Sequence, residues 1–320
     1  MSAELSVLNG DVLRTACDVL VLKYAQRFYG ADETVARVLG LQEEDFELRP
    51  GEHLVLPTHA KIQPRSVLLV GVPALYNFEY ADIRAFATHA LHILDSMNPE
   101  CESVAMTMHG VGYGLDEREA FTAQVAGLLD YLTAGDVHWE PQQIQIVERN
   151  LKRSQRIKDF LRAILLDSGY RAAKPKSNLV QSRLPDAGHG SETKKHVFVA
   201  MPYDDDMEDV YEFGIREPVN LAGCLCERCD RAVFTGDVME RVKERIDSST
   251  VVIADVTGSN PNVYLEIGYA WGRGVPTLLV ARKGENLKFD VTTHKCIFYS
   301  NISNLKKQLT QYLSCLLTEA

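Results

Sequence analysis

The stretch Val251–Gly272, VVIADVTGSNPNVYLEIGYAWG, decides how the second half of this chain folds. It opens with a short apolar, β-branched run that ends at Asp255, which is the pattern of a buried parallel strand. A turn rich in Gly, Ser and Asn follows, and Pro261 stands where a helix would begin. The stretch therefore predicts a strand, a tight turn and a helix in direct succession.

The expected helix carries one carboxylate, Glu266, in its second turn. In an open α/β sheet, ligands bind in the crevice beyond the carboxyl ends of the strands, and a helix that starts there faces that crevice. The helix dipole favours the ionised carboxylate, which is the form that a nucleophile needs. The neighbours of Glu266 are apolar: Leu265, Ile267, Ala270 and Trp271. This setting favours a functional carboxylate over a solvated surface residue.

The composition indicates a globular protein that is large enough for two cores. The chain has 320 residues, of which 46% are apolar and 24% charged, and this length suggests two domains. The net charge of −10 argues against a nucleic-acid partner, because affinity for duplexes is built mainly from clustered Lys and Arg. We see no export signal and no apolar run that approaches the length of a membrane span. We therefore expect a cytoplasmic protein without a membrane partner.

The cysteines predict buried thiols. Their number, seven, is odd, and without an export signal a disulfide framework is not expected. Cys224, Cys226 and Cys229 look like half a zinc site, but a second pair of ligands at the right spacing does not follow. We therefore expect no metal site and no cofactor.

The sequence divides into 1–166, a linker over 167–195, and 196–320. The segment 167–195 is polar, rich in Ser, Gly, Pro and Lys, and without apolar periodicity, which is typical of a linker. After it, apolar runs alternate with helical patterns, which predicts a parallel sheet with helices on both faces. We expect a flavodoxin-like five-stranded order. The predicted strands of this half are 196–201, the short run through the cysteines, 251–255, 277–281 and 296–299.

The first half also mixes strands and helices, and we expect a mixed sheet there, so the whole chain is predicted to be α/β. Its predicted strands are 6–8, 19–22, 53–57, 66–70, 104–107 and 144–147, and its predicted helices are 80–94, 117–132 and 154–166. In the second half, the helical pattern over 206–221 is interrupted near Gly214 and Pro218.

Five short motifs occur together in 196–317: VFVAMPY at 197–203, FTGD at 234–237, IADVT at 253–257, NPN at 260–262 and EIGYA at 266–270. As a set they resemble the nucleoside 2-deoxyribosyltransferase-like superfamily, closest to a bacterial nucleotide-binding, Toll/interleukin-receptor-like (TIR-like) branch. The resemblance implies that Glu266 attacks the anomeric carbon of a nucleoside or nucleotide. Asp255 ends its strand at the ligand-facing edge, where it would contact a sugar hydroxyl, order the loop or cap the local turn.

The resemblance also implies a substrate pocket around the ends of two strands. The expected pocket residues are Met201, Pro202, Tyr203, Asp204, Gly258, Ser259, Asn260 and Asn262. Asn260 falls where family members place a polar residue near the sugar or phosphate, and Ser259 could meet a phosphate at the helix N-terminus. Helix capping explains Asn260 and Asn262 equally well, and surface packing is the alternative for Tyr203.

One position departs from the family pattern. Family members carry an Asp that assists the departing base in the helix before the Asp255 strand, and this chain has Val242 there. Glu240 or Asp237 could substitute, although each has an ordinary structural explanation. A pyridinium base such as nicotinamide leaves without needing a proton, so NAD is a substrate that the chain could cleave without this acid.

Two stretches of the first half, LNGDVL at 8–13 with CDVLV at 17–21, and SVAMTMHGVGYG at 103–114, resemble the opening strands and phosphate loop of a macro domain. The resemblance implies a nucleotide signal, such as an ADP-ribose-like molecule, held by backbone N–H groups between glycines. The usual Asn after the second strand and the Gly-rich loop behind it are absent. The candidate ligand loop is His109, Gly110, Gly112, Tyr113 and Gly114. A purely structural histidine and plain turn glycines are the alternatives.

These observations predict an N-glycosidase that cleaves the base–ribose bond of a nucleotide, either NAD or a nucleoside monophosphate. Deoxyribosyl transfer is a variant of the same chemistry. By analogy, the macro-like half would sense a signal or assemble the protein, in a bacterial antiviral defence or stress effector. Related enzymes share active sites between subunits, so a homo-oligomer is expected. The alternatives are a nucleotide-binding regulatory module with little turnover and a scaffold in which neither pocket is occupied.

Overall fold

A computed structural model describes residues 3–43, 47–97, 100–135, 137–168, 184, 186–229, 237–287 and 295–318. The chain forms two compact units. The first consists of Met1–Val111 and Glu117–Ser191, and the second of Gly112–Asp116 and Glu192–Ala320. We call Gly112–Asp116 the inserted segment, because the chain on both sides of it belongs to the first unit.

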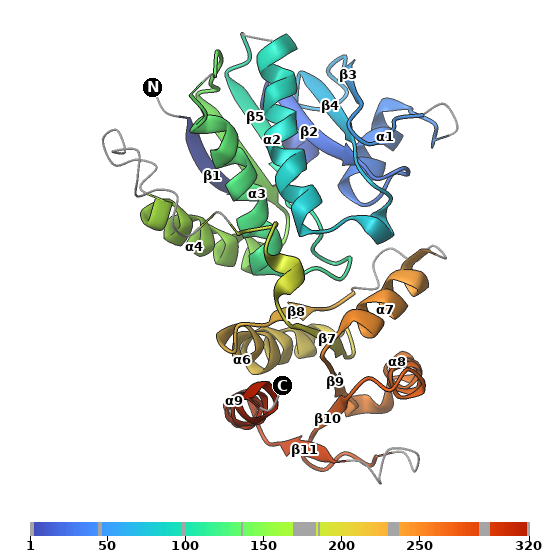
Figure 1. The fold of residues 1–320 in the computed structure, drawn as a ribbon. Helices are drawn as coiled ribbons and strands as arrows, with labels where there is room; N and C mark the ends of the chain where they lie inside the picture. Colours follow the sequence, from blue (N-terminus) through green and yellow to red (C-terminus); the bar gives the residue numbers. More distant parts are fainter. Residues whose placement is uncertain are drawn as a thin grey trace. The chain divides into compact units, whose positions relative to one another are not determined.

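The first unit is built on a six-stranded sheet in the order β1-β6-β5-β2-β4-β3 (Figure 1). Neighbouring strands are parallel except for the edge pair β3 and β4, which is antiparallel, so the expected mixed sheet is confirmed. The strands are β1 Glu4–Asn9, β2 Val19–Tyr24, β3 His53–Pro57, β4 Ser66–Gly71, β5 Ser103–Thr107 and β6 Gln143–Glu148. The helices are α1 Ala31–Leu39, α2 Tyr80–Met97, α3 Glu117–Leu132 and α4 Leu151–Ser168.

Helix α1 was not predicted from the sequence. It is short. Its N-cap residue is Gly30, which has a φ of 59° and no side chain that could form a capping hydrogen bond. The helix ends at Gly40, which adopts the left-handed conformation with a φ of 82° that suits glycine after a helix. The buried face of α1 includes Val35 and Ala36.

The second unit contains a five-stranded sheet in the order β11-β10-β9-β7-β8. All neighbouring pairs are parallel, which confirms the flavodoxin-like order. Its strands are β7 His196–Ala200, β8 Leu225–Glu227, β9 Val251–Asp255, β10 Thr277–Arg282 and β11 Cys296–Tyr299. Its longer helices are α7 Asp237–Ser248, α8 Pro261–Gly272 and α9 Ile302–Thr318.

The helical stretch after β7 changes its winding where an interruption was predicted. α5 (Asp205–Asp209), the π-helix η6 (Val210–Arg216) and α6 (Glu217–Leu221) follow one another directly. A Cβ at Gly214 would lie 2.8 Å from the Leu305 side chain of α9, so glycine allows α9 to pack closely here. Pro218 stands at the start of α6, where a missing N–H costs little.

Two hydrophobic clusters cover the two faces of the second sheet, because alternate strand residues point to opposite faces. On one face, Val199 and Ile253 pack with η6 and α9. On the other face, Phe198 and Ala254 pack with residues of α7 and α8, among them Val242 and Ile267. Helices α7 and α8 therefore share one face of the sheet.

The expected linker falls partly outside the described residues, which exclude 169–183 and 185. Its later part packs within the first unit. Arg84 donates hydrogen bonds from Nη1 to the carbonyl oxygens of Leu184 at 2.9 Å and Ala187 at 2.7 Å. Ser191 Oγ donates to Glu119 Oε1 at 2.6 Å.

Across the described residues, no helix has both the length and the apolar character that a membrane span requires.

Two glycines in helix interiors give a matched test of the packing. A Cβ at Gly127 of α3 would lie 2.2 Å from the carbonyl oxygen of Arg84 in α2, whereas nothing lies within 4 Å of a Cβ at Gly268 of α8. We predict that Gly127→Ala lowers the free energy of unfolding of the first unit by about 1–3 kcal/mol, because the backbones must separate. Gly268→Ala should stabilise the second unit by about 0.5–1 kcal/mol.

Urea unfolding followed by tryptophan fluorescence would measure both effects. Trp139 lies in the first unit and Trp271 in the second, so Trp271→Phe and Trp139→Phe backgrounds each report on one unit. A Gly127→Ala variant as stable as its background would contradict the close approach of α2 and α3.

Candidate functional site

The candidate site lies at the carboxyl edge of the second sheet, where the neighbouring strands β7 and β9 end. The chain continues from β7 to β8 on one side of this pair and from β9 to β10 on the other. The strand order therefore reverses between β7 and β9, which is where α/β sheets bind ligands. Residues 201–204 follow β7, and 256–260 connect β9 to α8.

Asp255, the last residue of β9, is fully buried. Its Oδ1 accepts a hydrogen bond from the Thr257 N–H at 3.0 Å, and its Oδ2 accepts one from the Tyr299 hydroxyl of β11 at 2.7 Å. Burial raises the pKa of Asp255, while these hydrogen bonds and the charge of Arg282 act in the opposite direction. Of the roles expected for this residue, the geometry supports ordering of the loop.

The turn after β9 is tight and ends in a capped helix. Gly258 and Ser259 both have left-handed backbones, with φ values of 71° and 53°, and this conformation is uncommon for serine. Asn260 Oδ1 accepts a hydrogen bond from the Asn262 N–H at 3.0 Å, so Asn260 caps α8 as one alternative predicted. Gly258 and Asn262 are exposed, and Ser259 and Asn260 are half-buried.

The segment after β7 differs along its length. Met201 and Pro202 are buried, Tyr203 is half-buried and Asp204 is exposed. The Tyr203 hydroxyl donates a hydrogen bond to the carbonyl oxygen of Cys229, the second residue after β8. This contact ties the expected pocket residues to the end of the neighbouring strand.

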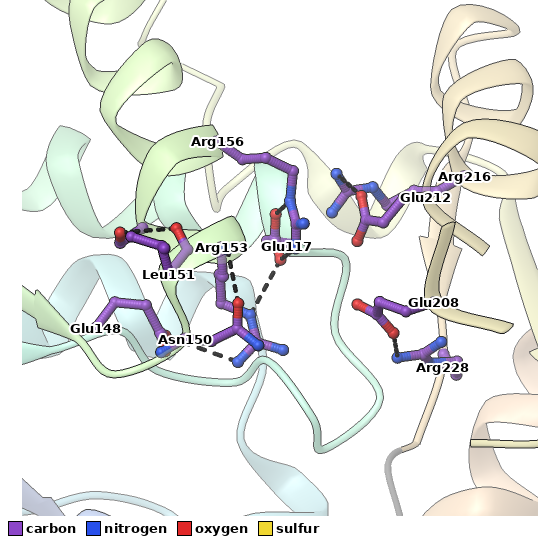
Figure 2. A network of polar contacts seen from close by, with 11 residues as sticks. Glu117, Glu148, Asn150, Leu151, Arg153, Arg156, Glu208, Glu212, Arg216 and Arg228 are labelled. Carbon is purple, nitrogen blue, oxygen red and sulfur yellow. Dashed lines mark hydrogen bonds and ion pairs between the residues drawn. The ribbon is translucent and has the colours of Figure 1, made fainter. Parts of the chain in front are cut away.

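Arg228 is a site residue that the sequence analysis missed. Its side chain is buried and lies 3.8 Å from the ring centre of Tyr211 and 5.6 Å from that of Tyr203. Nη2 donates to Glu208 Oε2 at 3.1 Å (Figure 2), and Nη1 is 3.8 Å from the sulfur of Met201. An arginine between two strand ends has no local sequence signal, because its partners are 17 to 27 residues away.

Glu266 is half-buried in the second turn of α8. Its negative charge affects the pKa of the buried Cys229 thiol. Burial is the main cause that raises the pKa of Cys229 to about 12, Arg241 and Arg245 lower it, and Glu266 raises it further. Cys229 thus accepts a hydrogen bond from Tyr203 and has a thiol whose pKa is affected by Glu266.

The position of the missing acid is apolar in the structure. Val242 is buried in the cluster that contains Val263 and Ile267 of α8. Glu240 does not replace the acid there, because its side chain is 70% exposed and pairs with Lys243 at 3.4 Å. The side chain of Asp237 lies outside the described residues.

The candidate ligand loop of the first half is divided between the two units. His109 and Gly110 belong to the first unit, and Gly112, Tyr113 and Gly114 belong to the second. The three glycines have left-handed backbones, with φ values of 83°, 88° and 96°, so glycine is needed at each for its conformation.

His109 is a buried, neutral histidine. Burial lowers its pKa well below the ordinary range, and the nearby Lys23 ammonium lowers it further. Its ring meets Phe86 edge-on at a centroid distance of 4.6 Å. Among the described residues, its Nε2 has no hydrogen-bond partner. Lys23 itself forms a buried ion pair with Asp32 of α1, with Nζ 2.9 Å from Oδ2.

The three clustered cysteines are buried thiols, and burial raises the pKa of each. Within the part of the chain that the structure describes, no group of three or more His, Cys, Asp or Glu side chains could hold a metal ion.

No family model matches this chain, and no curated protein is similar to it. Among solved structures, a macrodomain of Oceanobacillus iheyensis with ADPR is 16% identical, with a TM-score of 0.42 over 52% of this chain and 95% of that chain. A Trypanosoma brucei macrodomain in complex with ADP-ribose is 17% identical, with a TM-score of 0.41 over 49% and 68%. A CMP N-glycosidase of Clostridium botulinum is 22% identical, with a TM-score of 0.31 over 37% and 99%.

The resemblance of the second half to deoxyribosyltransferases stays a prediction.

The buried carboxyl of Asp255 predicts a pH-dependent stability. Because its pKa is raised in the folded protein, the folded state holds the proton more tightly than the unfolded chain. The stability it contributes is therefore complete below the unfolded pKa and is lost as the pH rises through the folded pKa. Asp255→Asn cannot ionise, yet it keeps an oxygen for the Thr257 N–H.

The free energy of unfolding of the wild type minus that of Asp255→Asn should therefore decrease as the pH rises above about 4, the usual pKa of an unfolded Asp. Urea unfolding in the Trp139→Phe background, followed through Trp271, measures this difference. A difference that stays constant with pH would refute the raised pKa.

Proposed function

We propose that the second unit is an N-glycosidase that cleaves the bond between the base and the sugar of a nucleotide, with Glu266 as the nucleophile. One observation carries the proposal. The sequence of α8, PNVYLEIGYAWG, contains a single charged residue, and that residue is half-buried in the helix that follows β9 at the reversal of strand order. A carboxylate in such a place loses part of its hydration, so a purely structural role would be an unfavourable use of it.

The chemistry follows from what a carboxylate can do beside an anomeric carbon. As the bond to the base breaks, positive charge develops on the sugar, and the Glu266 carboxylate stabilises that charge. Its oxygen then bonds to C1′ while the bonding electrons leave with the base, which gives a glycosyl ester. Water then attacks C1′, gives up a proton to the solvent and regenerates the carboxylate; the product is ADP-ribose from NAD or a sugar phosphate from a nucleoside monophosphate.

The surroundings of Glu266 favour a base that leaves without a proton. Val242 occupies the position of the expected acid, and Glu240 points to solvent as an ion pair. A nicotinamide base already carries positive charge and leaves as a neutral molecule, so NAD heads the proposed substrates. Nucleoside monophosphates, the class that includes CMP, come second. Deoxyribosyl transfer would proceed through the same glycosyl ester, with a second base in place of water.

The first unit would act as a sensor in this scheme. A nucleotide signal such as an ADP-ribose-like molecule would bind near His109 and Gly110 and regulate the second unit. By analogy with the family that the second half resembles, we also propose that the protein forms a homo-oligomer and acts in bacterial antiviral defence.

A second function is a nucleotide-binding regulatory module with little turnover. The observation in its favour is the same buried Val242, because a site without a leaving-group acid can retain binding while it loses catalysis.

Removal of the nucleophile tests the proposal. We predict that Glu266→Gln lowers the rate of base release by on the order of a thousandfold or more, because the amide cannot form the ester. Glu240→Gln is the matched control, since it makes the same change on an exposed side chain and should leave the rate unchanged. The substrates are NAD, CMP and dCMP, and chromatography measures the free base.

The two functions give different results. Base release by the wild type and by Glu240→Gln, but not by Glu266→Gln, supports the N-glycosidase. Tight binding of one nucleotide by the wild type in calorimetry, with no base released from any substrate, supports the regulatory module and rejects the enzyme.

A further inference from the structure

The inserted segment Gly112–Asp116 is held in the second unit by a buried carboxylate. Asp116 is 1% exposed, and its Oδ2 accepts hydrogen bonds from the Cys226 N–H at 2.9 Å and from Asn220 Nδ2 at 2.8 Å. Cys226 belongs to β8, the edge strand of the sheet. The Cys226 N–H points away from β7, the only neighbour of β8 in the described part of the sheet. Asp116 therefore accepts a hydrogen bond from a backbone donor on the unpaired side of this edge strand.

The middle of the inserted segment packs on Cys229, the second residue after β8. Tyr113 forms an isolated antiparallel bridge with Cys229, and Arg241 Nε of α7 donates to the Tyr113 carbonyl oxygen at 3.3 Å. A Cβ at Gly114 would lie 3.0 Å from Cys229 Sγ. The segment therefore fixes the backbone and the side chain of Cys229 from one side.

Cys229 connects the inserted segment to the site. Its carbonyl oxygen accepts the hydrogen bond of the Tyr203 hydroxyl, and the negative charge of Glu266 contributes to the raised pKa of its thiol. A shift of Cys229 would move the acceptor of Tyr203, and with it the segment after β7.

The residue after Asp116 is fixed in the first unit. Glu117 opens α3 and is 4% exposed. Arg156 of α4 donates from Nε to Oε1 and from Nη2 to Oε2, both at 2.9 Å, and Arg153 Nε donates to Oε2 at 3.2 Å (Figure 2). Two consecutive carboxylates are thus anchored by separate buried hydrogen-bond networks, one in each unit.

We propose that Asp116 is a positioning residue for the Glu266 site and acts through Cys229 and Tyr203, without touching the substrate. Its kinetic consequence rests on the proposed N-glycosidase function, but its structural consequence does not.

Two variants of Asp116 in the full chain test this proposal. Asp116→Ala removes the oxygen that accepts both hydrogen bonds, and we expect kcat for base release from NAD or CMP to fall about tenfold or more, with a smaller change in KM, because the site loses its alignment. Asp116→Asn can place its one oxygen where Oδ2 lies and should retain kcat within about threefold. Hydrogen exchange should become faster at residues 200–204 in the alanine variant alone.

Asp18→Ala is the matched control. The Asp18 carboxylate likewise accepts backbone N–H groups, from Glu102 at 3.1 Å and Ser103 at 2.9 Å, but within the first unit. This variant should leave both kcat and exchange at 200–204 unchanged. If Asp116→Ala fails to fold, Asn220→Ala removes one of the two hydrogen bonds and should shift both readouts in the same direction.

Normal kcat and unchanged exchange at 200–204 in Asp116→Ala would overturn the proposal. So would equal losses in the alanine and asparagine variants, since the hydrogen bonds would then not be the cause. A wild type that releases no base rejects the proposed function alone, and the exchange measurement then decides the role of Asp116.

Discussion

The buried carboxylate of Asp255 is the constraint on which the carboxyl edge of the second sheet depends. A carboxylate removed from water requires donors close by, and here they come from the following turn, through Thr257, and from β11, through Tyr299. These bonds fix the turn between β9 and α8. Pro261 then starts the helix at a set place, and Glu266 follows in its second turn. The hydrogen-bonded turn thus sets where α8 begins, and α8 carries the proposed nucleophile.

The second unit is assembled from parts of the chain that lie far apart. Tyr203 follows β7, and Glu266 belongs to α8. The inserted segment, which contacts Cys229, comes from a part of the sequence between β5 and α3 of the first unit. The hydrogen bond from Tyr203 to Cys229 is partly buried, so the loss of one partner leaves the other less well satisfied. The second unit is therefore discontinuous in sequence, because the inserted segment lies between two parts of the first unit.

Strong local patterns made most of the fold predictable. The β-branched run at 251–255 and the helix after Pro261 appear as expected, and the alternation of strands and helices led to the flavodoxin-like order. Helix α1 escaped prediction because it is short and lacks a side-chain cap. The sequence predicted an interruption near Gly214 but not the π-helical winding of η6. The other candidate site residues around Glu266 were implied by the family resemblance, which did not include Arg228 or Asp116.

The sequence by itself determined the element types, the parallel second sheet and the placement of one lone carboxylate early in a helix, because each depends on periodicity and turn chemistry within a few residues. Only the tertiary structure decided that Asp255 is a buried loop anchor and that Val242 is buried against α8. It alone assigned the glycine-rich segment at 112–116 to the second unit. Asp116 and the Cys226 N–H are 110 residues apart in sequence, and a hydrogen bond over that separation exists only once two sheets have folded. Local sequence patterns cannot identify a hydrogen-bond partner at such a distance along the chain.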